Sequence, residues 1–240
     1  MRSDCYLKAK DFSNALKGYV FIADKGFSRY YEPSALEAAR INYFELKNYT
    51  AAKKYFELLR TNAQSQDVQL EALRGLTRSY YQLKEYAQAG DAARELLAGK
   101  GLTTDDKSVA NLVLGKALQA DGDMNGAIDA FRRVTSINRS SWGAEARYEI
   151  AASYFGLKNL AQAEKAANAV IKETGSYDYW VTSAYILLGD IFMEQKDYFN
   201  AKATYESVAQ NAVIAELKAK AQDKLANAVA AEKQQSKISN

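Results

Sequence analysis

The sequence contains no histidine among its 240 residues. Histidine is the commonest general base near neutral pH and the commonest metal-binding side chain. The single cysteine, Cys5, has no neighbouring base in the sequence to activate its thiol, and neither standard glycine-rich phosphate loop occurs. These absences argue against catalysis, so we expect no enzyme activity, no metal site and no cofactor.

Proline and long hydrophobic runs are also scarce. Because proline interrupts helices, a single proline in 240 residues suits a chain that is helical nearly throughout. No apolar stretch is long enough to span a bilayer. Lys and Arg total 32 against 29 Asp and Glu, and this net charge of +3 is too balanced for a dedicated nucleic-acid binder. We therefore expect an all-α protein with no membrane span and no nucleic-acid partner.

A ten-residue pattern recurs along the chain. Its clearest copy, YYQLKEYAQA, occupies residues 80–89. Further copies occupy residues 6–15, 43–52, 154–163 and 192–201, with a weaker one at 118–127. The last residues of the copies are Ala15, Ala52, Ala89, Ala127, Ala163 and Ala201, spaced by 37, 37, 38, 36 and 38 residues. A fixed period in this range is the signature of a helical-repeat solenoid.

Each copy is predicted to span a helix, a turn and a second helix. A lysine ends the first helix, where the helix dipole favours a cation, and an Asp or Asn then caps the second helix. The turn pairs are Lys10-Asp11, Lys47-Asn48, Lys84-Glu85, Lys158-Asn159 and Lys196-Asp197, with Gly122-Asp123 in the weak copy. The final alanine shares one face of the second helix with apolar residues three before and four after it. We expect two helices to cross closely at this alanine.

The combination of these positions resembles the tetratricopeptide repeat (TPR) family. Tyr185, Leu188-Gly189, Phe192, Ala201 and Tyr205 match the family pattern, and Leu114-Gly115, Leu118, Ala127 and Phe131 give a second match. The resemblance covers nearly the whole chain and implies a right-handed α-α superhelix. Two features depart from the family: the period is longer than the usual length of about 34 residues, and the repeat-ending proline is missing.

Both departures are similar to the longer repeats of Gram-negative envelope proteins. Residues 176–208 also resemble the closing repeat of very large exported multi-repeat proteins from such bacteria. This resemblance implies a periplasmic or envelope-associated location and suggests that the chain is the C-terminal part of a longer protein. By the repeat register, Met1 falls inside the first helix of repeat one, which is also what a fragment would show.

The period divides the chain into one partial repeat, five full repeats and a final helix. The predicted boundaries are 1–30 for partial repeat one, then 31–65, 66–103, 104–139, 140–175 and 176–212 for repeats two to six. An amphipathic capping helix is predicted at 213–235, followed by a disordered tail at 236–240. The capping helix would cover the last apolar surface of the solenoid.

One segment imitates the start of a calcium-binding loop. Asp121, Asp123, Asn125 and Gly126 fit the first positions of such a loop, which needs a bidentate glutamate at its twelfth position. That position is Arg132, a cation where the ligand should be. The turn of repeat four already explains the segment, so we predict no calcium site.

In TPR proteins the first helices line the concave groove in which ligands usually bind. The register places Arg74, Arg78 and Tyr81 there in repeat three, with Lys116 in repeat four, as a basic cluster that could hold an acidic peptide. Other positions predicted to face the groove are Glu37, Ile41, Phe44, Leu112, Gln119, Tyr148, Phe155, Ile186, Asp190 and Met193. The candidate partner-binding residues are Phe44, Arg74, Arg78, Tyr81, Lys116, Tyr148, Phe155 and Met193. Some of these aromatic residues could instead pack between repeats.

The resemblance implies a non-catalytic scaffold that binds a partner protein or peptide in its groove. Two alternatives stay open at this point. The segment could be a structural module that packs on the rest of its own longer chain. The 17 tyrosines could instead stack on sugars in a peptidoglycan- or glycan-associated factor.

Overall fold

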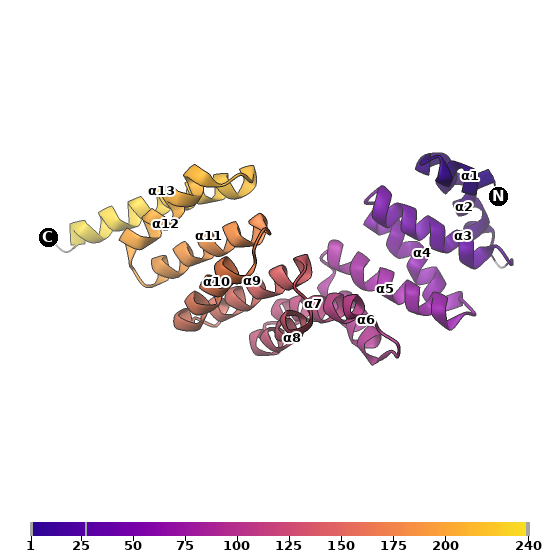
Figure 1. The fold of residues 1–240 in the computed structure, drawn as a ribbon, viewed down its shortest axis with the longest axis horizontal. Coiled ribbons are helices and arrows are strands. Elements are labelled where there is room, and N and C mark those ends of the chain that lie inside the picture. The colour runs from indigo at the N-terminus through magenta and orange to yellow at the C-terminus, as the bar shows by residue number, and fades with distance from the viewer. Residues whose placement is uncertain (1, 27, 239–240) are drawn as a thin grey trace. The chain divides into compact units, whose positions relative to one another are not determined.

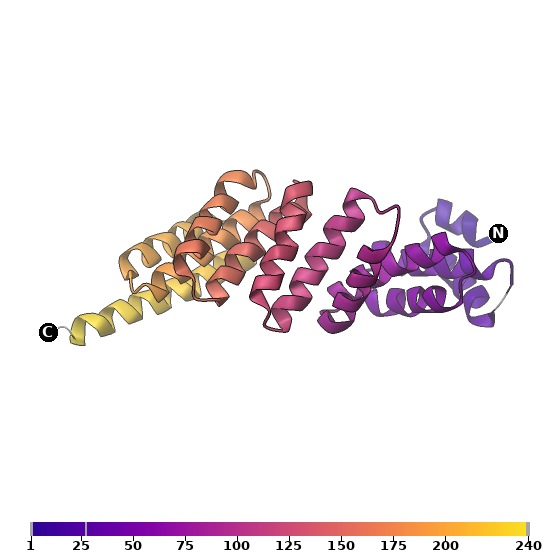
Figure 2. The same cartoon turned by 90° about the horizontal axis from the view of Figure 1, so that it is seen from below.

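A computed structural model describes residues 2–26 and 28–238, and within these ranges every regular element is a helix, as the sequence predicts. The chain forms two compact units, residues 1–120 (unit 1) and 121–240 (unit 2), shown in Figures 1 and 2. Unit 1 contains α1 (Arg2–Lys8), α2 (Phe12–Lys25), α3 (Tyr31–Arg40), the π-helix η1 (Ile41–Glu45), α4 (Tyr49–Asn62), α5 (Gln66–Gln82), α6 (Tyr86–Ala98) and α7 (Thr104–Ala120). Unit 2 contains α8 (Met124–Ile137), α9 (Ser141–Gly156), α10 (Leu160–Glu173), α11 (Asp178–Glu194), α12 (Tyr198–Asn211) and α13 (Ala215–Ile238).

Within each unit, helices that are consecutive in sequence pack side by side. The first helices of successive repeats also touch one another: α5 contacts α3 and α7 in unit 1, and α11 contacts α9 and α13 in unit 2. Each unit therefore has one face built from first helices, which we call the first-helix face. In unit 2, α13 completes this face as a first helix would. Within the described residues, no helix combines the length and the hydrophobicity needed to cross a membrane.

The turns between paired helices share one backbone geometry. Lys10, Lys47, Lys84, Lys158 and Lys196 all have φ between 54° and 60°, and Gly122 in the weak copy has φ 85°. In repeat three the amide of Lys84 donates to the carbonyl of Tyr81 and the amide of Glu85 donates to that of Tyr80, at 3.0 and 2.9 Å. This is the Schellman helix ending, which requires a left-handed residue. These five lysines therefore occupy positions that require a left-handed backbone, and they also place a favourable positive charge at the end of the helix.

The predicted N-caps are present in five of these turns. The side chains of Asp11, Asn48, Asp123, Asn159 and Asp197 each accept a hydrogen bond from the backbone amide three residues later. Glu85 makes no such bond from its longer side chain. Asp123, which heads the calcium-like segment, is therefore used to cap α8.

The repeat alanines form the helix crossings, as predicted. Ala15, Ala52, Ala89, Ala127, Ala163 and Ala201 are all 0% exposed. Larger buried residues pack four positions later, among them Tyr19, Phe56, Phe131 and Tyr205. In the core of each unit, the paired helices therefore cross at buried alanines, and aromatic rings pack beside several of these crossings.

Two elements differ from the simple repeat. The first helix of repeat two ends in η1, where the amide of Leu46 bonds to the carbonyl of Ile41 at 3.0 Å across five residues instead of four. The final helix α13 begins at Ala215 and continues to Ile238, beyond residue 235 where the sequence analysis ends the capping helix. Residues 236–238 of the predicted tail are thus helical, and 239–240 lie outside the described residues.

Candidate partner-binding surfaces

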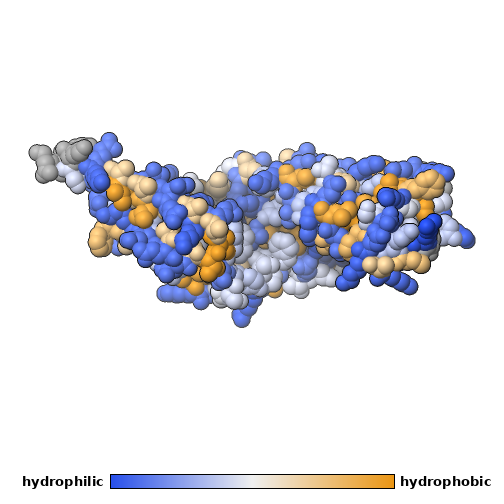
Figure 3. Space-filling view, turned by 90° about the horizontal axis from the view of Figure 1, so that it is seen from above, coloured by the Kyte–Doolittle hydropathy of each residue, from blue (hydrophilic) through white to orange (hydrophobic). Residues whose placement is uncertain are grey.

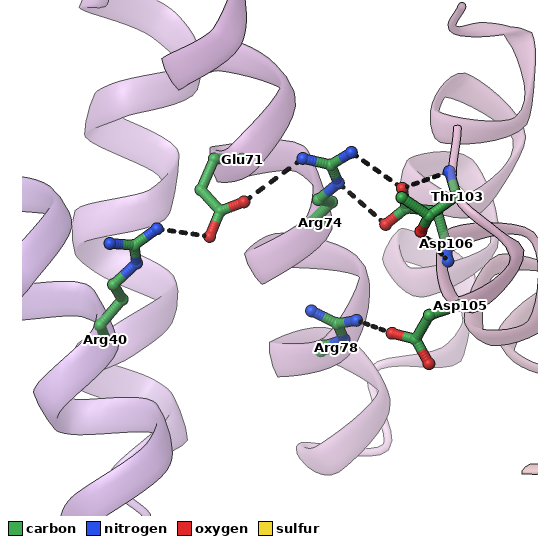
Figure 4. Close-up of polar contacts among 7 residues, drawn as sticks. All are labelled: Arg40, Glu71, Arg74, Arg78, Thr103, Asp105 and Asp106. Carbon is green, nitrogen blue, oxygen red and sulfur yellow. Dashed lines mark hydrogen bonds and ion pairs between the residues drawn. The ribbon is translucent and has the colours of Figure 1, made fainter. Parts of the chain in front are cut away.

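The two arginines of the predicted basic cluster, Arg74 and Arg78, are part of an ion-pair ladder that links three first helices (Figure 4). Arg40 of α3 pairs with Glu71 of α5 at 3.0 Å, and Glu71 is also 3.5 Å from Arg74. Arg74 then donates to both carboxylate oxygens of Asp106 of α7, each at 2.8 Å. The guanidinium of Arg78 pairs with Asp105 at 2.6 Å. We call this set of residues the unit 1 ladder.

Asp106 is the most buried member of the unit 1 ladder, at 4% exposure. Its carboxylate also accepts the amide of Thr103 at 3.0 Å, while its own amide donates to the Thr103 hydroxyl at 3.1 Å. Burial acts to raise the pKa of Asp106, but the hydrogen bonds from Arg74 and Thr103 outweigh it and lower that pKa. The same Asp106 bonds raise the pKa of Arg74. Both charges are therefore stabilised inside the protein.

Arg74 and Arg78, predicted to face the groove as part of a basic cluster, are mostly shielded from solvent. Their side chains are only 21% and 22% exposed, because each lies against the next repeat and pairs with an aspartate there. The aspartates are 27 to 32 residues away in sequence, so the repeat register did not reveal these pairs. The ladder neutralises most of the positive charge that would attract an acidic peptide.

The other candidates of unit 1 have different environments. Phe44 is 50% exposed, with its ring edge-on to Tyr43 at a centroid distance of 4.8 Å. Tyr81 and Lys116 are half-buried and interact with other groups of the protein. Two positions expected in the groove, Ile41 and Leu112, are buried at 2% and 0% exposure, because they pack into the core.

Unit 2 has a hollow of about 320 Å³ on its first-helix face, which we call the unit 2 hollow. It brings together the predicted residues Phe155 of α9 and Met193 of α11, both half-buried. Its remaining lining residues are Asp190, Glu194, Tyr205, Lys224 and Asn227. Three successive elements of the first-helix face thus contribute: α9, α11 and α13. Ile186, also expected in the groove, is 2% exposed and belongs to the core.

Asp190 organises the polar side of the unit 2 hollow. Its Oδ1 atom accepts the Tyr205 hydroxyl at 2.5 Å and the Lys224 ammonium at 2.6 Å. Burial first, and then the bond to Asp190, raise the pKa of Tyr205, so this hydroxyl stays protonated at neutral pH. At the rim, the ammonium of Lys158 lies 2.9 Å from Glu194 and 5.4 Å from the centre of the Phe155 ring.

Sequence reasoning missed Lys224 and Asn227. Both lie on α13, which the sequence analysis treated only as a cap, and neither belongs to the repeat that identified the other positions. One signal was available: the Asp190–Tyr205 pair has a counterpart in Asp4–Tyr19 with the same separation of 15 residues. That recurrence could have predicted the hydrogen bond between Asp190 and Tyr205. It could not have predicted that Lys224 bonds to the same aspartate.

A group of aromatic rings lies on the same helices of unit 2. Tyr148 of α9 and Trp180 of α11 have ring centroids 5.4 Å apart at an angle of 37°. Tyr179 meets Trp180 edge-on at 4.9 Å and 85°. Burial, followed by the charges of Glu149 and Asp190, raises the pKa of Tyr148. Tyr148 was predicted as a partner-binding residue, whereas Tyr179 and Trp180 were not.

The comparisons with known proteins agree with this architecture. Residues 109–141 and 183–212 each match a family model described as a tetratricopeptide repeat. The fold is a TPR solenoid. No curated protein matches the sequence significantly. The two matched segments contain the motifs at Leu114-Gly115 and Leu188-Gly189 on which the sequence resemblance rests.

Several solved structures share the fold at low sequence identity. A thermophilic TPR protein of Thermus thermophilus is 18% identical, with a TM-score of 0.56 over 81% of this chain and 98% of that one. The C-terminal part of a TPR repeat-containing protein from Cytophaga hutchinsonii is 16% identical, with a TM-score of 0.63 over 95% and 83%. YrrB, described as a TPR protein with an unusual peptide-binding site, is 15% identical, with a TM-score of 0.55 over 79% and 91%.

Proposed function

We propose that the protein is a non-catalytic scaffold that binds a segment of a partner protein on the first-helix face of unit 2. The supporting observation is the unit 2 hollow, whose polar groups are only partly used. Within the described residues, Oδ2 of Asp190 and the side-chain amide of Asn227 make no hydrogen bond. They lie beside the apolar surfaces of Phe155 and Met193. Such a mixture of apolar area and unused polar atoms is typical of a recognition site.

The fold supports this use in physical terms. Repeats that stack in one direction present an extended surface made from equivalent helices, so a bound segment can contact several repeats at once. The similar protein YrrB is described as having a peptide-binding site. On the face drawn in Figure 3, hydrophobic residues form patches among hydrophilic ones.

A role for Arg74, Arg78, Tyr81 and Lys116 in binding stays a prediction, and the structure changes how it is tested. Reversing the charge of Arg74 would leave the buried Asp106 without its partner. Loss of binding in that variant would therefore not separate recognition from folding. Phe44, half-exposed and outside the ladder, is the better probe of the unit 1 face. A Phe44→Ser variant keeps the ladder intact.

We also propose an envelope location in a Gram-negative bacterium, as part of a larger exported protein. The long repeat period and the motifs of residues 176–208 support this proposal. Fractionation of the source cells tests it with an antibody against unit 2. Recovery in the periplasmic or envelope fraction supports the location, and recovery only with cytoplasmic markers refutes it.

Site-specific photo-crosslinking tests the binding face. A photoreactive residue at Met193 faces the hollow, while one at Tyr185, 41% exposed on the same helix but in none of the hollow's lining, serves as the control. We expect a discrete protein adduct in the source cells from position 193 and not from position 185. Asn227→Ala should weaken binding of the captured partner by about two- to tenfold, the value of one hydrogen bond.

Other outcomes would overturn the proposal. Adducts only within the protein's own longer chain would identify a structural module. A glycan adduct would favour the peptidoglycan-associated alternative. Equal capture from positions 185 and 193 would show that the first-helix face has no special role.

A further inference from the structure

The aromatic rings of unit 2 lie where a ligand can reach them. Tyr179 is 42% exposed, while Tyr148 and Trp180 are half-buried beside it. The three rings meet at different angles, 37° for one pair and 85° for the other, so they do not form a single flat stack. They come from two neighbouring first helices, α9 and α11, which fixes their positions relative to one another.

Carboxylates from three helices lie near these rings. After burial, the groups that raise the pKa of Tyr179 are Glu216 of α13 and then Glu145 and Glu149 of α9. Asp190 of α11 acts in the same direction on Tyr148. Of these carboxylates, Asp190 is paired with Lys224, so its charge is largely balanced within the protein.

The carboxylates differ in what they can contribute. Glu145 and Glu149 are buried, at 8% and 7% exposure, and interact with other groups of the protein, so a ligand has little access to them. Glu216 is exposed and makes no hydrogen bond or ion pair within the described residues. Tyr179 and Glu216 lie near the starts of α11 and α13, which pack against each other, so the unpaired carboxylate is on the helix next to the exposed ring.

We propose that the cluster of Tyr148, Tyr179, Trp180 and Glu216 binds lysine or arginine side chains of a basic segment in the partner protein. We call it the aromatic–acidic cluster. An ammonium or guanidinium group is attracted both by the ring faces and by the carboxylate, whereas an anion is repelled by both. This inference rests on the proposed function and names the chemistry of the partner. The expected partner is therefore basic, not the acidic peptide predicted from Arg74 and Arg78.

The protein already shows this type of contact within unit 2. The ammonium of Lys158 lies over the Phe155 ring while it pairs with Glu194. An aromatic face and a carboxylate on this face of unit 2 can thus hold one cation together. The aromatic–acidic cluster presents the same two groups without an internal lysine between Tyr179 and Glu216 in the described contacts.

Fluorescence of Trp180 provides a direct binding assay. In a Trp142→Phe background, Trp180 is the only tryptophan, because the chain has two. The probes are three 15-residue peptides that differ only at four positions, which hold arginine, glutamate or glutamine. We expect the arginine peptide alone to change Trp180 emission saturably, and to bind more weakly as salt rises because exposed charges are screened. Binding of the glutamate peptide at equal affinity would overturn the inference.

Three variants in the same background locate the contact. Tyr179→Ala and Glu216→Gln should each weaken arginine-peptide binding by about two- to fivefold, the range of an exposed cation–π contact. Tyr185→Ala removes an equally exposed tyrosine of α11 outside the cluster and should leave binding unchanged. Circular dichroism confirms the fold of each variant, and Glu216→Gln keeps the test valid if Tyr179→Ala is destabilised.

The result separates this inference from the proposed function. If the partner captured at Met193 binds normally to Tyr179→Ala and Glu216→Gln, the basic-segment inference is wrong and the scaffold proposal stands. If position 193 captures no partner, the scaffold proposal fails whatever the peptides do. If the arginine peptide binds both variants as tightly as it binds the parent protein, that result alone contradicts the inference.

Discussion

Two buried tyrosines each depend on a hydrogen-bond acceptor at a fixed position earlier in the chain. Tyr19 and Tyr205 are 2% and 1% exposed, and each donates its hydroxyl to an aspartate 15 residues earlier. At the equivalent position, repeats two and four have Phe56 and Phe131, which need no polar partner. A buried hydroxyl without an acceptor loses its hydrogen bonds to water, so a tyrosine at this position requires Asp4 or Asp190.

The first prediction concerns the hydroxyl of Tyr205. Tyr205→Phe should lower the free energy of unfolding by about 1 kcal/mol, because one hydrogen bond to Asp190 is lost while the ring still fills its place. Tyr198→Phe, which removes a hydroxyl with no such bond, is the matched control and should change stability little. Urea denaturation of both variants provides the measurement. Equal stability of Tyr205→Phe and the parent would mean that the Asp190 bond is not formed in solution.

At the scale of elements, the sequence predicted the local features well. Caps such as Asn48 and crossings such as Ala52 depend on residues within one helix pair, so their spacing was enough. The pairing of Arg74 with Asp106 depends on how one repeat sits against the next, which a single repeat pattern does not contain. Lys224 was missed for a related reason, since α13 joins the first-helix face without carrying the repeat motif.

The left-handed lysines give the second prediction. Lys84 has φ 59°, a conformation that costs a non-glycine residue about 1 kcal/mol. Lys84→Gly should therefore raise the free energy of unfolding by up to about 1 kcal/mol. Lys17→Gly, in the interior of α2, should lower it by about the same amount. Thermal and urea denaturation can show this reversal of sign, and a loss of stability for both variants would contradict the turn geometry.

The unit 1 ladder gives the third prediction, on pH. The pKa of Asp106 is lower in the folded protein than its ordinary value, because the bonds from Arg74 and Thr103 outweigh burial. Its stabilisation is therefore fully present above the unfolded value of about 3.9 and is lost as pH falls through the lower folded value. Asp106→Asn should cost about 1–3 kcal/mol at pH 7, and the difference from the parent should shrink below about pH 4.

Asp105→Asn is the matched control for this titration. Its carboxylate also pairs with an arginine, Arg78, but its side chain is 55% exposed, so we expect a cost below about 1 kcal/mol. Urea denaturation from pH 3 to pH 7 measures both variants. A stability difference for Asp106→Asn that is constant over this range would show that Asp106 does not titrate with folding.

At the scale of the whole molecule, the two units use the same repeat for different surfaces. The first-helix face of unit 1 carries a ladder whose charges are paired internally. The first-helix face of unit 2 carries the hollow and the aromatic–acidic cluster, where Asn227 and Glu216 make no hydrogen bond or ion pair within the described residues. TPR architecture alone did not predict this difference, because it arises from the few side chains that vary between otherwise equivalent positions.

Amide hydrogen exchange of the whole chain, with and without the arginine peptide, tests the central claim most directly. Bound segments slow exchange where they stabilise the local structure, and mass spectrometry assigns the effect to individual helices. The account predicts slower exchange in α9, α11 and α13 at saturating peptide, with α3, α5 and α7 unchanged. Protection confined to α3, α5 and α7, or no protection at saturation, would contradict it.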